Sequence, residues 1–116
     1  MNEFLHEQLP PESMILSGRG PVPDRYGFQS NALQVFYARS EESWEDERAH
    51  AHLEADECFL VLQGAVVVEV DGEEHVIGPR EYAFFPRGVF HRIARVVPPV
   101  EAFMIRAPSV EDKVYR

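Results

Sequence analysis

The stretch HAHLEADECFLVLQG, residues 50–64, brings three potential metal ligands close together in the chain. His50 and His52 are two positions apart, so on a strand their side chains share one face, about 6.6 Å apart. Two imidazoles at that spacing can bind one ion at N–metal distances of about 2.0–2.2 Å. Glu57 follows at the start of the next predicted strand. The stretch therefore predicts part of a metal site built on β structure.

A third histidine completes a candidate ligand set. His91 ends the stretch PRGVFH, residues 86–91, and comes three residues after the glycine of a Pro-x-Gly turn. Only a sheet that curves back on itself would bring it to His50 and His52. Taken singly, a His-x-His pair is also common on a solvated strand face, and a lone histidine is also common in a hydrogen-bonded core. His6 and His75 receive no role.

The sequence around these stretches predicts an all-β sandwich or barrel. Short segments rich in β-branched and aromatic residues alternate with turns and show almost no helical periodicity. Asp71-Gly72 predicts a tight hairpin, and Gly78-Pro79 and Pro98-Pro99 predict breaks. Ser109 at the start of 109–115 predicts at most a short C-terminal helix. The predicted strands are 33–39, 57–62, 65–70, 73–77, 81–85, 90–97 and 100–107.

The first thirty residues differ from the rest of the chain. Proline and glycine punctuate them, and the apolar island 14–16 is short. We therefore expect residues 1–31 to form an N-terminal arm that contains one candidate strand, and residues 32–116 to form one β domain.

The charge and the cysteine content of the chain limit the partners and the location that we expect for the protein. The chain has 116 residues with 20 acidic and 11 basic side chains, a formal net charge of -9. Such a surface disfavours nucleic acid and anionic membranes as partners and leaves a small molecule as the expected ligand. The single cysteine, Cys58, excludes an intrachain disulfide, and residues 1–12 do not resemble an export signal. The expected location is the cytoplasm.

Two motifs resemble those of the cupin superfamily. His50-Ala-His52-x4-Glu57-x6-Gly64 is similar to its first motif, and Pro86-Arg-Gly88-x2-His91 is similar to its second. The resemblance implies a jelly-roll-like β-barrel with the three histidines and Glu57 pointing inward. It also implies one divalent transition-metal ion on these four residues, such as iron, manganese, zinc or nickel, and a homodimer.

The implied function is that of a metal-dependent cupin acting on a small organic molecule. Three histidines and a carboxylate leave coordination positions open on the ion, which favours a dioxygenase-type oxidoreductase. Glu57 is the candidate catalytic residue, because it can either stay a fourth ligand or take a proton from the substrate. A cupin-type isomerase and a non-catalytic binding or sensing module remain alternatives.

The predicted strands also suggest which side chains surround the ligands. Cys58 faces away from Glu57 and is expected to be structural. Arg95 and Arg106 are candidates either for binding a substrate carboxylate or for the surface. The aromatic residues Phe36, Tyr82, Phe84 and Phe103 are expected in the core or in the cavity wall. Strand parity places four further side chains on the faces of the ligands: Phe59, Val61, Ile93 and Arg95.

Overall fold

The computed structural model describes residues 4–20 and 27–116, and these residues form strands without any helix. This confirms the predicted all-β fold. The strands are β1 (Met14–Gly18), β2 (Phe28–Gln29), β3 (Gln34–Ser40), β4 (His50–His52), β5 (Asp56–Val70), β6 (Glu73–Ile77), β7 (Tyr82–Phe85), β8 (Arg92–Ala107) and β9 (Lys113–Tyr115).

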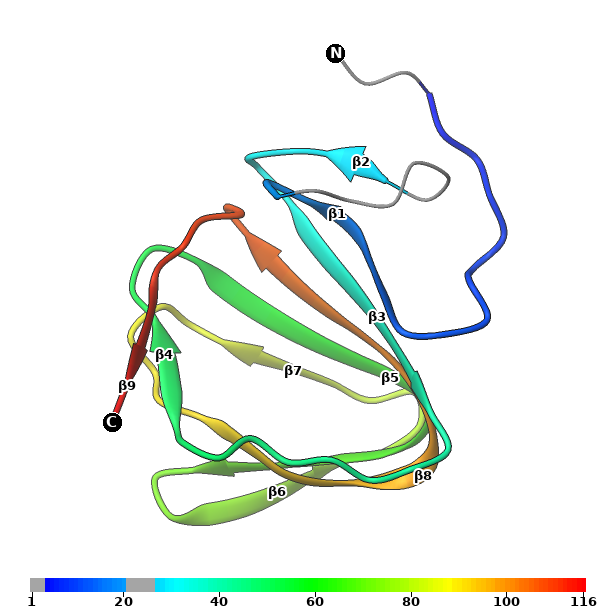
Figure 1. Cartoon of the computed structure of the whole chain (residues 1–116). Helices are drawn as coiled ribbons and strands as arrows, with labels where there is room; N and C mark the ends of the chain where they lie inside the picture. Colours follow the sequence, from blue (N-terminus) through cyan, green and yellow to red (C-terminus); the bar gives the residue numbers. More distant parts are fainter. Residues whose placement is uncertain (1–3, 21–26) are drawn as a thin grey trace.

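One strongly curved sheet dominates the molecule (Figure 1). Its strand order is β2-β1-β3-β8-β5-β6, and β7 pairs with β5 beyond the end of β6. The two short strands β4 and β9 form a separate antiparallel pair. In the described part of the chain, hydrogen bonding does not close the large sheet into a complete barrel. The curvature nevertheless gives the sheet a concave inner face.

Strand register decides which residues occupy this inner face. Neighbours directly across a sheet point to the same side, and alternate residues along a strand do too. The row nearest the start of β5 is polar, and the next two rows are apolar. From the polar end, the rows across β3, β8 and β5 are Gln34–Arg106–Glu57, Phe36–Met104–Phe59 and Ala38–Ala102–Val61.

The apolar rows continue into the hydrophobic core, where Trp44 packs from the loop before β4. Burial of such side chains contributes about 25 cal/mol per Å² of apolar surface, so this face holds the fold together. The core residues are Ala38, Phe59, Val61, Val66, Val68, Ile77, Phe85, Ile93, Val96, Val100, Ala102 and Met104.

The central strands β5 and β8 are each longer than predicted. The expected breaks at Gln63-Gly64 and at Pro98-Pro99 are irregularities inside continuous strands, because the pairing of β5 with β8 shifts register there. In a bulge, the extra residues do not form the regular hydrogen bonds between strands. The two prolines, which have no backbone N–H to donate, are therefore tolerated there.

Gly64 has a φ of 71°, and a Cβ at this position would lie 2.4 Å from the carbonyl oxygens of Val97 and Pro99. Only glycine allows the two strands to approach this closely.

Residues 109–115, for which the sequence allowed at most a short helix, form no helix. Ser109 does not cap a helix; its hydroxyl is buried and accepts a hydrogen bond from the Arg19 N–H at 3.1 Å. Residues 113–115 instead form β9, which pairs along β4. A helix of one or two turns is marginal by itself, whereas pairing with β4 satisfies the backbone groups of both strands.

Part of the predicted arm is integrated into the sheet. The apolar island lies in β1, which pairs antiparallel with β3 and parallel with β2. Residues 1–3 and 21–26 of the predicted arm, which include Pro21 and Pro23, lie outside the described residues. The boundary between residues 31 and 32 stays a prediction. No helix in the described ranges has the length and hydrophobicity needed to cross a bilayer.

Candidate metal centre

Backbone pairing brings the four predicted ligands together. His50 and His52 occupy the two ends of β4, Glu57 is the second residue of β5, and His91 directly precedes β8. His50 and His91 exchange two backbone hydrogen bonds, of 2.9 and 2.8 Å, and the Gly88 N–H donates to the His52 carbonyl at 2.7 Å. The two stretches that carry the histidines are therefore joined directly, although they are far apart in the chain.

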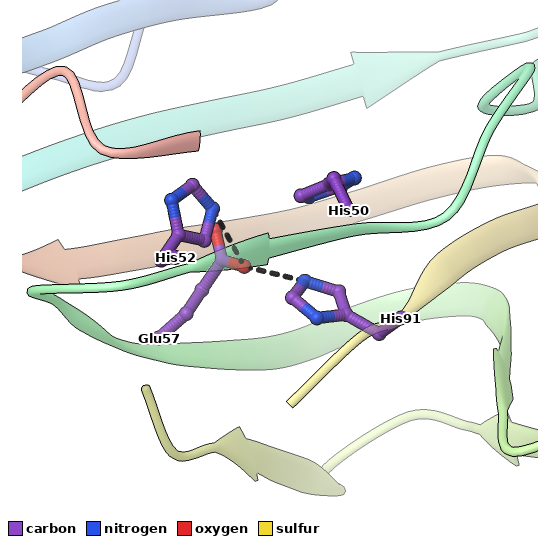
Figure 2. Close-up of side chains that lie close together, drawn as sticks. All are labelled: His50, His52, Glu57 and His91. Carbon is purple, nitrogen blue, oxygen red and sulfur yellow. Dashed lines mark hydrogen bonds and ion pairs between the residues drawn. The ribbon is translucent and has the colours of Figure 1, made fainter. Parts of the chain in front are cut away.

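The side chains of the four residues converge on one point (Figure 2). One ligand atom from each residue lies within 4.8 Å of the others. The Glu57 Oε1 is 2.8 Å from His91 Nε2 and 3.5 Å from His52 Nε2. The His91 and His52 side chains are 1% and 3% exposed, and that of Glu57 is 11% exposed. The structure thus forms the buried cluster that the sequence predicted, and this cluster could hold a metal ion.

The environment favours the protonation states that metal binding requires. Burial, followed by the charges of His91 and Lys113, lowers the pKa of His50 to about 4, so this imidazole is neutral at pH 7. Burial alone would raise the pKa of Glu57, but its hydrogen bond with His91 and the nearby histidine charges hold the pKa below its ordinary value. Glu57 is therefore an anion at neutral pH.

Outer partners orient two of the imidazoles. The His91 Nδ1 lies 3.0 Å from the Val89 carbonyl oxygen, and the His52 Nδ1 lies 2.8 Å from Asp112 Oδ1. Because a carbonyl and a carboxylate can only accept hydrogen bonds, each Nδ1 carries a proton and each Nε2 faces the cluster. A metal ion would bind at both Nε2 atoms and would displace the proton through which His91 Nε2 contacts Glu57 Oε1 at 2.8 Å. The ring of Phe85 stacks on His91 with a centroid distance of 4.2 Å.

The family follows from a comparison of the sequence with protein-family models. Residues 37–105, more than half of the chain, match the model described as "Cupin domain". The chain belongs to the cupin family. The match spans β5 and β8 almost completely and includes all four clustered residues of this cupin. Among curated proteins, none matches the sequence significantly.

Several solved structures share the fold of this cupin. A variant of Streptomyces PAC13 with uridine is 15% identical over 100% of this cupin and 92% of that chain, with a TM-score of 0.69. A cupin-superfamily sugar phosphate isomerase from Silicibacter pomeroyi is 26% identical over 73% of this cupin and 57% of that chain, with a TM-score of 0.61. KdgF from Halomonas sp. is 18% identical over 88% of this cupin and 85% of that chain, with a TM-score of 0.63.

Three of the four clustered residues, His50, His52 and Glu57, line a cavity of about 260 Å³ on the inner face of this cupin. A larger hollow of about 580 Å³ lies beside β6 and β7, but none of the four ligands lines it. We therefore assign the functional site to the smaller cavity. Its other lining residues are Gln34, Phe36, Trp44, Asp46, Phe59, Ile93, Met104, Arg106 and Lys113.

The structure resolves most of the predictions about neighbouring side chains. Phe59 and Ile93 line the cavity, whereas Val61 lies deeper in the core. Arg95 does not line the cavity; it is exposed and pairs with Glu74 at 2.9 Å. The parity argument failed because the β5–β8 register shifts between Val67 and Val68, which adds one residue on β8 between positions 93 and 95.

Of the predicted aromatic side chains, Phe36 lines the cavity. Tyr82 and Phe84 are exposed beside the larger hollow, and Phe103 packs against Tyr37 with ring centroids 5.3 Å apart. Cys58 is partly buried, as expected for the face opposite Glu57, and burial raises the pKa of its thiol.

Asp112 is a site residue that the sequence did not reveal. In addition to its contact with His52, its Oδ2 accepts hydrogen bonds from the N–H groups of Glu54 and Ala55 at 3.0 and 2.9 Å. Burial opposes its charge, but the bonds to His52 and to these N–H groups hold the pKa of Asp112 below its ordinary value. No local motif marks this residue, because it lies 60 positions beyond His52.

Replacing Asp112 by asparagine is expected to weaken metal binding by about 10- to 100-fold. The asparagine oxygen can still accept the hydrogen bonds from the N–H groups of Glu54 and Ala55. Its NH₂ group then faces His52 Nδ1, which favours the imidazole tautomer with the proton on Nε2. The measurement is a competition titration with Zn²⁺ and a chromophoric chelator. The exposed neighbour Glu111→Gln is the matched control. An unchanged affinity of D112N would show that His52 needs no carboxylate partner.

Proposed function

We propose that this cupin binds one divalent transition-metal ion on His50, His52, Glu57 and His91 and catalyses a reaction of a small organic molecule. The observation that supports this is the convergence of four donor atoms within 4.8 Å, with three of the four residues lining a cavity. Ligands on opposite sides of one ion with bonds of about 2.1 Å are about 4.2 Å apart, so small side-chain shifts suffice.

The donor set fits a transition metal. Three imidazole nitrogens and one carboxylate suit iron, manganese, zinc or nickel, whereas calcium and magnesium favour all-oxygen ligands. A bound ion would supply a Lewis acid with coordination positions left open for an oxygen of the substrate.

The lining of the cavity favours proton-transfer chemistry, as in an isomerase or a dehydratase. Glu57 is buried and ionised, so it can accept a proton from a substrate carbon or hydroxyl held beside it. Gln34, Asp46 and Arg106 supply polar groups that suit an oxygen-rich substrate. Two structural neighbours are consistent with this class, since one is called a nucleoside dehydratase and another a sugar phosphate isomerase.

A dioxygenase is the second candidate function. The cavity wall near the ligands also contains apolar side chains, among them Phe36, Phe59 and Met104. An apolar wall around a metal with open positions suits the binding of dioxygen and of a substrate with an apolar part.

The test separates these reactions by their need for oxygen. The protein is loaded with Fe²⁺, Mn²⁺, Zn²⁺ or Ni²⁺, its metal content is measured, and a panel of hydroxy acids, sugar acids, enols and catechols is followed by NMR with and without oxygen. We expect turnover without oxygen, and we expect Glu57→Gln to lower kcat by about 100-fold or more in a metal-loaded sample.

Other outcomes of the same experiment select the alternatives. Turnover that requires oxygen would identify the dioxygenase. Metal binding without turnover across the panel would favour a binding or sensing module. Absence of metal from every preparation would refute the proposed centre.

A further inference from the structure

Two cationic side chains line the cavity together with three of the predicted metal ligands, His50, His52 and Glu57. Arg106, near the end of β8, lies in the polar row between Gln34 and Glu57. Lys113 is the β9 residue directly opposite His52. Both residues also border a second hollow of about 390 Å³, so they lie where the two hollows meet.

The hydrogen bonds of Arg106 leave part of its guanidinium unsatisfied. Its Nη2 donates to Gln34 Oε1 at 2.8 Å. Its Nη1 lies 3.3 Å from His52 Nδ1, but that nitrogen carries the proton shared with Asp112 and has no free lone pair. The buried Nε has no partner among the described residues. Arg106 therefore has donors beside the ligand cluster that lack an acceptor.

No carboxylate in the described residues forms an ion pair with Arg106 or Lys113. Other arginines of the chain do have such partners: Arg92 lies 3.6 Å from Glu69, and Arg95 lies 2.9 Å from Glu74. A partly buried guanidinium without a counter-charge is costly unless an anion binds there. The two cations at the cavity are thus available to an external anion, even though the chain as a whole is acidic.

The charge balance of the cavity supports an anionic ligand. Asp46 also lines the cavity, but its Oδ2 is engaged by the Ile93 N–H at 2.8 Å. With a divalent ion on the cluster, the positive charges of the lining exceed the negative charges of Asp46 and Glu57. The cavity of about 260 Å³ lies below the range of about 300–1,000 Å³ that drug-sized ligands occupy, so the anion is small.

We propose that Arg106 and Lys113 form an oxyanion subsite that binds a carboxylate or phosphate of the substrate. The same molecule then places a neighbouring hydroxyl or carbonyl oxygen at the predicted metal centre. This second part rests on the proposed function, whereas the anion subsite does not. The substrate class is a small hydroxy acid, keto acid or sugar phosphate, and Arg106 and Lys113 are its specificity-determining residues.

Calorimetric titration tests the subsite with three probes: lactate, its uncharged analogue lactamide, and inorganic phosphate. Each is titrated into Mn²⁺-loaded and metal-free protein. We expect lactate or phosphate to bind the loaded protein at least about 10-fold more tightly than lactamide, because charge-assisted hydrogen bonds favour the anion. The ratio of lactate to phosphate affinity distinguishes the carboxylate from the phosphate.

Four variants test whether Arg106 and Lys113 are responsible for the affinity for the anions. Arg106→Gln and Lys113→Gln are each expected to weaken anion binding by about 10- to 100-fold, and Arg106→Lys by less, because it keeps the charge. Lactamide binding is expected to stay unchanged. Arg95→Gln on the same strand is the control, since Arg95 does not line the cavity. Thermal melts verify that each variant is folded, and Lys113→Gln changes only an exposed side chain.

The outcomes separate this inference from the proposed function. If the protein holds no metal but both Gln variants still weaken anion binding to the metal-free protein, the subsite stands and the metal centre fails. If metal binds but neither variant changes the affinity for lactate or phosphate, the subsite is wrong. Equal affinity for lactate and lactamide together with no binding of phosphate, or failure of both anions to bind below about 10 mM, would also overturn it.

Discussion

Replacing His52 by alanine is expected to lower the metal content of the purified protein from about one ion per chain to about a tenth of that or less. The substitution removes one of four donor groups and leaves a hole where a side chain 3% exposed had been. It also deprives Asp112 of its contact at 2.8 Å, so a buried carboxylate loses one of its partners. Elemental analysis of protein prepared in the same medium measures the effect.

His75→Ala is the matched control for this variant. His75 is an exposed histidine of β6 and lies outside the cluster. Like H52A, the H75A variant removes one imidazole from the chain. It therefore measures how much metal is held by a histidine on the surface. If H52A and H75A retain equal amounts of metal, the four-residue centre is not where the ion binds.

Replacing Gly64 by alanine is expected to lower the free energy of unfolding by about 3–5 kcal/mol, a large part of the roughly 5–15 kcal/mol of a typical domain. The positive φ of 71° disfavours any L side chain, and the new methyl would lie 2.4 Å from two backbone carbonyl oxygens of β8. Backbone atoms inside a sheet cannot move away cheaply. Urea denaturation with a constant m-value provides the measurement.

Gly72→Ala separates the two causes of this loss. Gly72 also has a positive φ, 79°, but no atom outside its chain neighbours lies within 4 Å of a Cβ placed there. It should therefore lose only about 1 kcal/mol, the cost of the backbone conformation. Equal losses in the two variants would show that β5 and β8 are not in close contact at residue 64.

Local sequence patterns were sufficient for several features of the molecule. The His-x-His pair followed by Glu57 and the Pro-x-Gly turn before His91 predicted the four members of the cluster, which the structure brings within 4.8 Å. The Asp71-Gly72 hairpin occurs as predicted between β5 and β6. These features succeed because each depends on the alternation of a strand or on the conformation of one turn.

Other features depended on pairing between distant segments. The irregular register of β5 against β8 turned Arg95 outward, although simple alternation had placed it on the inner face. The same pairing merged predicted strand pairs into single long strands through Gly64 and Pro98-Pro99. A bulge changes the parity of all later residues, and the sequence of one strand does not reveal where its partner requires one.

The type of fold was therefore already contained in the order of the residues, because strand alternation and turn preferences are local properties, and the clustered ligands were implied by the similarity of two motifs to those of cupins. The partners of that cluster were not. Asp112 reaches His52 only because the last residues pair with β4 instead of forming a helix, and Arg106 faces the cavity only because of its register against Gln34 and Glu57. Contacts between segments far apart in the chain arise from packing of the whole chain, and they decide which charges surround the site.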